Sequence, residues 1–288
     1  MLRIAQISDL HFSRLTYGLS QFFSKQWIGN LNLLFSRQKD YVPENLNLLP
    51  GLFKDLNVHY VIVCGDVSTT SQRSEFALAS HFVQHLAASD ASPIVVPGNH
   101  DHYTKKAYKQ KWFYDFFPSH FSSPIKKFNL KDHGVAAKFL ENGWWVVTLD
   151  TALATSLISS KGYFSPFIEF NLEELLSQIP DKDSVILVNH FPFFQNESPR
   201  KALIRGPELQ ALIRRSPKIK FYLHGHSHRH CIADLRADGL PVILDSGSTA
   251  HKDHGTWNLI EIAPKETSVT AYMWQKNKWQ PHKQVSIS

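Results

Sequence analysis

The sequence predicts an α/β fold built from layers of sheet and helix. Three observations lead to this prediction: short apolar runs recur along the 288 residues, helical patterns lie between several of them, and polar residues follow the ends of the runs. Near-continuous runs rich in Val, Ile and Phe are typical of strands buried on both faces. Their alternation with helices favours a layered α/β architecture over an all-helical or all-strand fold.

We expect buried strands at seven places, in chain order 2–7, 59–64, 93–96, 144–149, 184–188, 219–223 and 241–244. Residues 71–89 and 168–179 repeat apolar side chains at helical spacing and are expected to form helices. From residue 256 onward, apolar and polar residues alternate with a period near two in "TWNLIEIAP", "TSVTAYMWQ" and "KWQPHKQVSI". This alternation predicts antiparallel strands that close a second sheet. We expect residues 1–288 to form a single domain.

Composition narrows the class of protein. Hydrophobic residues make up 43% and charged residues 19%, so the chain can bury a core of ordinary size. The net charge of +6 suits an anionic substrate, an anionic membrane surface or nucleic acid, and does not choose among them. No long run of Lys or Arg is present, so no nucleic-acid partner is expected. Two cysteines are too few for the usual thiolate zinc site.

Sequence patterns also bear on the compartment. No stretch of about 18 uninterrupted apolar residues occurs, so no membrane-spanning helix is expected. The first residues, "MLRIAQISDLHF", lack the basic and apolar regions of a signal peptide. We therefore expect a cytoplasmic protein, with peripheral membrane contact left open.

The residues that end the predicted strands carry the chemistry. The first strand is followed by D-x-H, the second by Gly-Asp, the third by "PGNHDHY", the fifth by Asn-His and the sixth by G-H-x-H. In open α/β sheets, ligands bind outside the carboxyl ends of the strands, so these five ends are expected to converge. The candidate residues are Asp9, His11, Asp66, Asn99, His100, Asp101, His190, His226 and His228.

Carboxylate, amide and imidazole groups in this arrangement suit two divalent ions. Alternate residues leaving a strand point to the same side, so Asp9 and His11 can share one ion. The two oxygens of Asp66 can bridge two ions, and His226 and His228 can each serve one. Two ions about 3.5–4 Å apart can clamp a phosphoryl group and activate a water molecule for attack on it. The sequence therefore predicts a two-metal hydrolytic site.

The five blocks, all present and in this order, resemble the calcineurin-like metallophosphoesterase superfamily over about residues 1–250. The resemblance implies a two-sheet β-sandwich flanked by helices, with a binuclear metal centre at its edge. The first ion would be bound by Asp9, His11, Asp66 and His228. The second ion would be bound by Asp66, Asn99, His190 and His226.

The same resemblance implies roles for the two residues after Asn99. His100 would lie over the substrate, as a proton donor to the leaving oxygen or a stabiliser of phosphoryl charge, and Asp101 would orient its imidazole. His102 lies outside the motif and is given no role, while a contact near the metals or substrate stays open for His224. Family members that act as scaffolds usually lack a ligand or this catalytic histidine. This chain keeps all of them, which favours an enzyme.

A segment between the first and second blocks bears on the substrate. Within residues 15–42, apolar side chains recur at three- and four-residue steps, which predicts one face of an amphipathic helix. These side chains are Leu19, Phe22, Phe23, Trp27, Leu31, Leu34 and Phe35. With basic neighbours, such a helix fits an anionic membrane or a lipid pocket, and a core-packing helix is the alternative. If the segment lines a lipid pocket, Phe23 and Trp27 are candidate substrate contacts.

A basic stretch at residues 198–218 follows the predicted ligand His190. Arg200, Lys201 and Arg205 are candidate phosphate contacts at the lip of a pocket. For the basic residues further along this stretch, a solvated helix face is the alternative.

Within the superfamily, the helical insertion and the "HFPFF" segment resemble the UDP-2,3-diacylglucosamine pyrophosphatases of lipid A biosynthesis. This implies hydrolysis to UMP and 2,3-diacylglucosamine 1-phosphate at the cytoplasmic face of the inner membrane. A generic cytosolic phosphodiesterase, for example on cyclic nucleotides, and a non-catalytic metal-binding scaffold stay as alternatives. The ligand set accepts Mn²⁺, Fe²⁺ or Zn²⁺, and the family likeness favours Mn²⁺.

Overall fold

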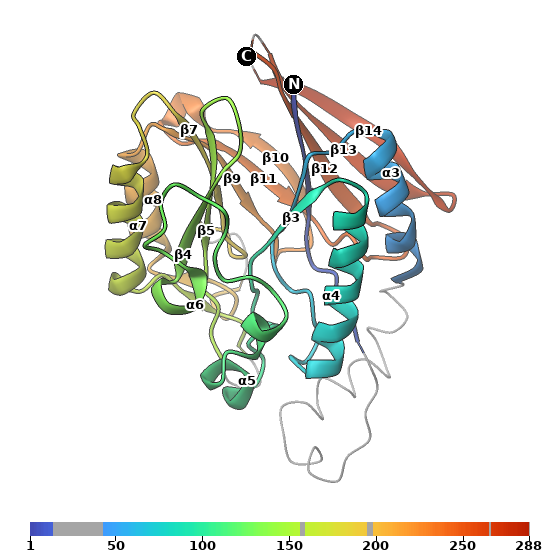
Figure 1. Ribbon diagram of the computed structural model, residues 1–288, viewed down its shortest axis with the longest axis horizontal. Helices are drawn as coiled ribbons and strands as arrows, with labels where there is room; N and C mark the ends of the chain where they lie inside the picture. Colours follow the sequence, from blue (N-terminus) through green and yellow to red (C-terminus); the bar gives the residue numbers. More distant parts are fainter. Residues whose placement is uncertain (14–42, 156–158, 195–197, 265, 288) are drawn as a thin grey trace.

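Figure 1 shows the computed structural model, which describes residues 1–13, 43–155, 159–194, 198–264 and 266–287. Within these residues the chain forms two six-stranded sheets that pack together, with helices on both outer faces. This is the two-sheet α/β sandwich that the sequence predicts. The amphipathic helix predicted within residues 15–42, with Phe23 and Trp27, lies outside the described residues.

The first sheet has the order β14-β13-β12-β1-β2-β3. Its strands are β1 (Leu2–Ile7), β2 (Tyr60–Val63), β3 (Ser92–Val95), β12 (Thr256–Ile262), β13 (Thr267–Gln275) and β14 (Lys278–Ile287). β1, β2 and β3 are parallel, and β12 pairs antiparallel with β1. The prediction that the C-terminal strands close a second sheet was wrong, because their pairing with β1 makes them an extension of the first one.

The second sheet has the order β10-β11-β9-β7-β5-β4. Its strands are β4 (Val135–Phe139), β5 (Trp144–Leu149), β7 (Ser184–Val188), β9 (Ile219–His224), β10 (His230–Asp234) and β11 (Val242–Ser246). β5, β7, β9 and β11 are parallel to one another. The short strands β6 (Gly162–Tyr163) and β8 (Leu203–Ile204) pair separately.

Helices cover the outer face of each sheet (Figure 1). The first sheet is covered by α3 (Leu49–Asp55) and α4 (Arg73–Ala88), and the second by α7 (Pro166–Gln178) and α8 (Gly206–Arg214). The short helices are α5 (Lys105–Lys109) and α6 (Leu130–His133), with 3₁₀ turns η3 (Pro43–Leu48), η4 (Trp112–Asp115) and η5 (Arg236–Asp238). Among the described residues, no helix is long and apolar enough to cross a membrane.

Local signals place the long helices. α4 starts at a capping box, in which Gln72 and Glu75 satisfy backbone amides at the helix start. α7 starts with the Ser165 hydroxyl accepting from the amide of Ile168, and Pro166 follows at the first helical position. Each helix then turns an apolar face toward its sheet. A third apolar cluster, with members such as Ile4 and Val188, fills the space between the sheets.

The cluster between the first sheet and its helices supplies a stability prediction. Trp257 is fully buried, stacks on Tyr272 with ring centroids 4.2 Å apart, and meets Phe53 edge-on at 5.0 Å. Replacing Trp257 with Ala should lower the free energy of unfolding by about 3–5 kcal/mol, because a large cavity is left. Urea denaturation measures this loss. The matched control Phe170→Ala, at a ring that is 62% exposed, should change stability by less than about 0.5 kcal/mol.

Candidate metal centre

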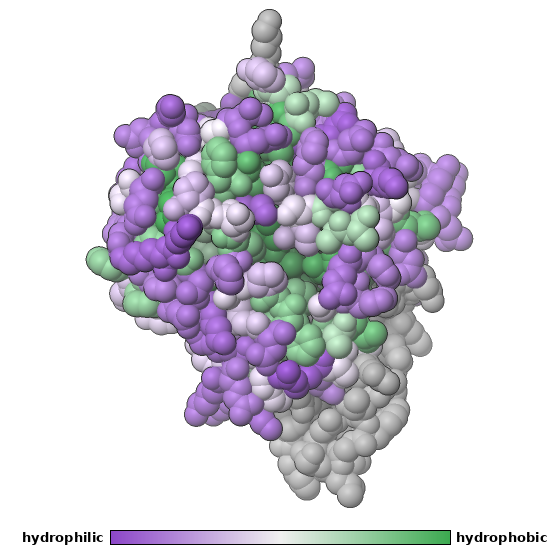
Figure 2. Space-filling model, in the orientation of Figure 1, coloured by the Kyte–Doolittle hydropathy of each residue, from purple (hydrophilic) through white to green (hydrophobic). Residues whose placement is uncertain are grey.

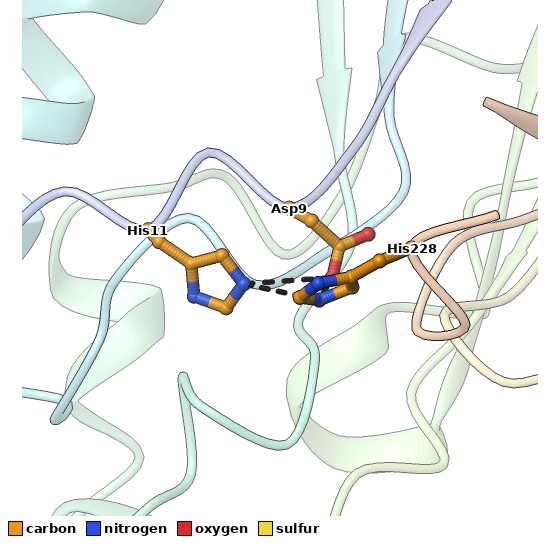
Figure 3. A group of neighbouring side chains, drawn as sticks. All are labelled: Asp9, His11 and His228. Carbon is orange, nitrogen blue, oxygen red and sulfur yellow. Dashed lines mark hydrogen bonds and ion pairs between the residues drawn. The ribbon is translucent and has the colours of Figure 1, made fainter. Parts of the chain in front are cut away.

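The loops that leave β1 and β9 bring three predicted ligands of the first ion together (Figure 3). The Oδ1 atom of Asp9 lies 3.0 Å from Nε2 of His228 and 3.7 Å from Nε2 of His11. The two imidazole Nε2 atoms lie 3.4 Å apart. The carboxylate is fixed from its other side, where Oδ2 accepts from the Ser8 hydroxyl at 2.6 Å and from the backbone amide of His226 at 3.1 Å.

The loops after β2, β3 and β7 form the other half of the cluster. Nε2 of His190 lies 3.4 Å from Oδ2 of Asp66, 3.2 Å from Oδ1 of Asn99 and 3.3 Å from Nδ1 of His226. Asp66 is also held through its other oxygen, which accepts from the backbone amide of His100 at 2.7 Å. The second predicted ligand set is therefore assembled around one point.

Hydrogen bonds at the far sides of two rings fix their tautomers. Nδ1 of His190 lies 2.7 Å from the carbonyl of Cys64, and Nε2 of His226 lies 3.0 Å from the carbonyl of Lys201. A carbonyl only accepts, so these two nitrogens carry the protons. In the neutral rings, the nitrogens that face each other at 3.3 Å both carry lone pairs. Two lone pairs, an amide oxygen and a carboxylate oxygen in one place fit a cation between them.

Three overlapping groups of metal-binding side chains occur among the described residues, each with ligand atoms within 4.8 Å of one another. They are Asp9–His11–His228, His11–Asp66–His100 and Asp9–Asp66–His190. The groups share Asp9, Asp66 and His11, so they form one continuous centre rather than separate sites. This donor set of carboxylates and imidazoles suits divalent first-row metals.

The pKa values follow from this crowding. Burial raises the pKa of Asp9, but His228 and His190 outweigh it and hold that pKa below its usual range. The pKa of Asp66 is likewise lowered, against burial, by His190 and His100. Burial lowers the pKa of His226 to about 3. In His190, Asp66 and Asp9 outweigh burial and raise the pKa to about 9. A metal ligand must be deprotonated, so an ion beside His190 would displace its proton.

The backbone at the centre is unusual. Five of the seven predicted ligands have positive φ angles: Asp9 (56°), His11 (48°), Asp66 (54°), His226 (69°) and His228 (56°). Residues other than glycine rarely adopt this left-handed conformation, which costs about 1–3 kcal/mol at each position. Such strain persists only where the surrounding structure imposes it, and it gathers at functional sites.

Two glycines allow the loops to approach the carboxylates closely. A Cβ on Gly225 would lie 1.9 Å from the Ser8 hydroxyl oxygen and 2.5 Å from Oδ2 of Asp9. A Cβ on Gly98 would lie 2.2 Å from Oδ1 of Asp66. All three distances are far inside van der Waals contact. The Gly residues in the G-H-x-H and G-N-H-D blocks are therefore required by packing against the ligands.

His100 lies over the same centre. Its Nδ1 donates to the Thr69 carbonyl at 2.7 Å, its ring stacks on Tyr103 at 5.4 Å, and its edge meets the ring of His11 at 4.9 Å. With Nδ1 held on the Thr69 side, the opposite edge of the ring faces the ligand group that contains His11 and Asp66.

The structure revises the expected contact of Asp101. Its carboxylate accepts from the backbone amides of Val67, Ser68 and Gly98 at 2.8–3.2 Å, and from the Ser68 hydroxyl at 2.8 Å. The Thr69 carbonyl, rather than Asp101, accepts from Nδ1 of His100. Asp101 therefore acts on His100 through the 67–69 backbone that it holds in place.

The predicted phosphate contacts divide into two kinds. Residues 200 and 201 lie beside the centre, since the Lys201 carbonyl meets His226. The Arg205 guanidinium instead pairs with Glu169 at 2.6 Å and Glu208 at 3.2 Å, on α7 and α8. These carboxylates satisfy Arg205 within the fold, so the structure does not place it as a phosphate contact. Phe23 and Trp27 lie outside the described residues.

Some groups that hold the site in place gave little or no signal in the sequence. The carbonyls of Cys64, Thr69 and Lys201 hold three of the imidazoles, and any residue type could supply them. Asp245, at the end of β11, binds the hydroxyl of Ser227 between His226 and His228 and accepts from the Gly247 amide at 2.8 Å. Its place at a strand end in "LDSGST" was the one signal that could have revealed it.

A sandwich with a cluster of buried carboxylates and imidazoles at its strand ends defines a metal-dependent phosphoester hydrolase. The sequence matches the family described as calcineurin-like phosphoesterase over residues 2–230, and the chain belongs to this family. The fold is similar to a dimetal phosphatase from Danio rerio, with 11% identity, a TM-score of 0.66, and coverage of 100% of this chain and 98% of that one. A purple acid phosphatase from yellow lupin gives 12% identity and a TM-score of 0.63, with coverage of 100% and 53%.

Curated relatives are more similar in sequence. The 3′,5′-cyclic adenosine monophosphate phosphodiesterase CpdA of Escherichia coli K12 is 26% identical over 210 residues, which cover 71% of this chain and 66% of that protein. The corresponding protein of Escherichia coli O157:H7 gives the same values. The match thus spans 66% of the length of the curated relatives.

The close approach at Gly225 supplies a prediction about metal content. In Gly225→Ala, the new Cβ should push Asp9 and Ser8 away, so that bound metal falls from about two ions per chain to fewer than one. Metal per chain is measured by plasma mass spectrometry after loading and desalting. The control Gly51→Ala adds a Cβ that meets nothing within 4 Å and should leave metal content unchanged. Full metal content in Gly225→Ala would contradict this account.

Proposed function

We propose that the chain hydrolyses phosphodiesters with two divalent ions held by Asp9, His11, Asp66, Asn99, His190, His226 and His228. The observation that carries this proposal is that Asp66, Asn99 and His226 each place a ligand atom within 3.2–3.4 Å of Nε2 of His190. Bound ions would supply Lewis-acid polarisation of the phosphoryl oxygens. By family likeness, Mn²⁺ is the expected metal.

His100 is the proposed catalytic residue. The Thr69 carbonyl holds the Nδ1 proton, which turns the other edge of the imidazole toward the ligands and any phosphoryl group on them. From there the protonated ring can stabilise phosphoryl charge or give a proton to the departing oxygen. Asp101 is a positioning residue, because it fixes the loop that carries the Thr69 carbonyl.

A 3′,5′-cyclic nucleotide is the first candidate substrate. The support is the 26% identity with the Escherichia coli cyclic AMP phosphodiesterase, whose match covers 71% of this chain. It agrees with the phosphodiesterase alternative from the sequence. A cyclic nucleotide is a phosphodiester with a ribose oxygen as leaving group, which is the kind of oxygen that His100 would serve.

UDP-2,3-diacylglucosamine is the second candidate. Its support is the amphipathic pattern of residues 15–42, with Phe23 and Trp27 on the apolar face, which suits acyl chains or an anionic membrane surface. On this alternative, Arg200 and Lys201 are the proposed phosphate contacts, and the protein works at the cytoplasmic face of the inner membrane.

Two assays separate the candidates. With Mn²⁺, the protein should convert 3′,5′-cyclic AMP to 5′-AMP. Chromatographic separation of the two nucleotides measures this conversion. Asp66→Ala, which loses the carboxylate between the two ligand sets, should lose at least about 10³-fold in rate. Release of UMP from UDP-2,3-diacylglucosamine in detergent, without turnover of cyclic AMP, would reverse the order of the candidates. The proposed function would be refuted if the fully metal-loaded protein hydrolysed neither substrate and no generic phosphodiester.

Replacing His100 tests its role separately from the metals. His100→Ala should keep its bound metal and lower kcat about 10²–10⁴-fold, because a proton donor and charge stabiliser is lost while the other predicted ligands stay. Metal content and steady-state kinetics with the same substrate measure both effects. Loss of metal in His100→Ala would instead make His100 a ligand, in keeping with its place beside His11 and Asp66.

A further inference from the structure

A cavity of about 390 Å³ lies beside the loop that carries Asn99 and His100. Its wall comes from α5, α6, the first turn of α7 and the end of β5. His102 lines it, two residues beyond His100, and Tyr103, the residue after His102, stacks on the His100 ring. Two residues of chain span at most about 7 Å, so the cavity adjoins the candidate metal centre. None of the seven predicted metal ligands lines the cavity, so the two sites are separate.

The cavity has a basic wall. Lys109, Lys111 and Lys131 line it, together with the aromatic rings of Tyr108 and Phe167. These lysines belong to a longer basic segment, residues 105–131, which contains seven lysines and one acidic residue, Asp115. Figure 2 shows hydrophilic residues gathered over α5 at the lower left of the molecule. Such a wall attracts anions.

The two acidic residues of the wall offset only part of this charge. Asp150 is engaged by the fold, since its carboxylate accepts from the Tyr114 hydroxyl at 2.5 Å and from the Ala152 amide at 3.2 Å. Asp132 lies exposed on α6. Asp150 keeps its charge in these hydrogen bonds, and Asp132 is exposed as Lys109 and Lys131 are, so the three lysines exceed the two carboxylates of the wall by one positive charge.

A buried polar atom in the wall indicates a ligand. The His102 side chain is 2% exposed, and its Nδ1 has no hydrogen-bond partner among the described residues. Its Nε2 lies 3.5 Å from Asp150, at the outer limit of a hydrogen bond, and Tyr114 already donates to the same oxygen. A carboxylate oxygen accepts more than one hydrogen bond, so Nε2 can donate to Asp150 beside Tyr114, and Nδ1 stays the ring atom without a partner among the described residues. Buried polar groups normally have a partner, so a ligand hydroxyl, such as that of hydrogen phosphate, is expected beside this atom.

We propose that this cavity is a second phosphate-binding site, bounded by Lys109, Lys111, Lys131 and His102 and separate from the metal centre. The ligand is inorganic phosphate or the phosphate group of a larger compound. Tyr108 and Phe167, which are 39% and 57% exposed, would contact the organic part of such a compound. The site goes beyond the proposed hydrolysis, and its occupancy can be measured without any turnover.

Phosphate binding to the metal-loaded protein provides the test. Equilibrium dialysis with radiolabelled inorganic phosphate should find two phosphates per chain, one at the metals and one in the cavity. The triple variant Lys109→Gln, Lys111→Gln, Lys131→Gln should bind one. The control Lys105→Gln, Lys106→Gln, Lys126→Gln removes the same charge from the same segment, outside the cavity wall, and should bind two. Equal binding by the two triple variants, or one phosphate on the wild type, would overturn the proposal.

A further variant assigns the phosphates. Asp66→Ala should keep the cavity phosphate and lose the metal-bound one, so loss of the cavity phosphate in this protein would also count against the site. Sedimentation with phosphatidylcholine vesicles that contain phosphatidic acid then separates the two sources. Binding lost only in the cavity variant identifies a lipid headgroup as ligand, whereas equal sedimentation of both variants, with the dialysis result intact, identifies a soluble phosphate compound.

Discussion

The structure depends on one electrostatic constraint, which is that buried acceptor atoms from five loops point at one another. Asp9 and Asp66 are almost fully buried, and once the proton of His190 is displaced the facing nitrogens of His190 and His226 both carry lone pairs. Such groups repel each other unless a positive charge lies between them. The fold must therefore hold the cluster together by other contacts, and most hydrogen bonds around the centre do this.

Two parallel strand sets make that possible. β1, β2 and β3 of one sheet and β7 and β9 of the other end at the same edge of the sandwich, so five loops meet there. The bonds between them cross from sheet to sheet: Ser8 and the His226 amide hold Asp9, and the Cys64 carbonyl holds His190. Left-handed backbone at five of the predicted ligands is the cost of aiming side chains inward from such short turns. A metal ion bound there would offset the repulsion, so metal binding and folding would be linked.

The sequence predicted the parts that depend on residue type and failed where geometry alone decides. The sequence singled out Asp9, His11, Asp66 and His190, because a carboxylate or imidazole directly after a buried apolar strand rarely serves packing alone. The Thr69 carbonyl could not, because every residue has one, so the sequence named Asp101 as the residue that orients His100 without the Thr69 contact that the structure shows. The C-terminal strands were predicted correctly as strands but placed in the wrong sheet. The alternation of apolar and polar residues shows which face of a strand is buried. It does not show which strand pairs with β12, because that depends on the edge of β1 that β2 leaves unpaired.

The loop of residues 98–103 connects these findings. His100 is held from three sides: its amide donates to Asp66, its Nδ1 donates to Thr69, and its ring stacks on Tyr103. The first contact ties His100 to a carboxylate of the candidate metal centre, and the last ties its ring to Tyr103, the residue that follows His102. A shift of Asp66 on metal binding, or of residues 102–103 on ligand binding in the cavity, would therefore be transmitted to the same imidazole. The position of the His100 ring is thus coupled to both neighbouring sites through these contacts.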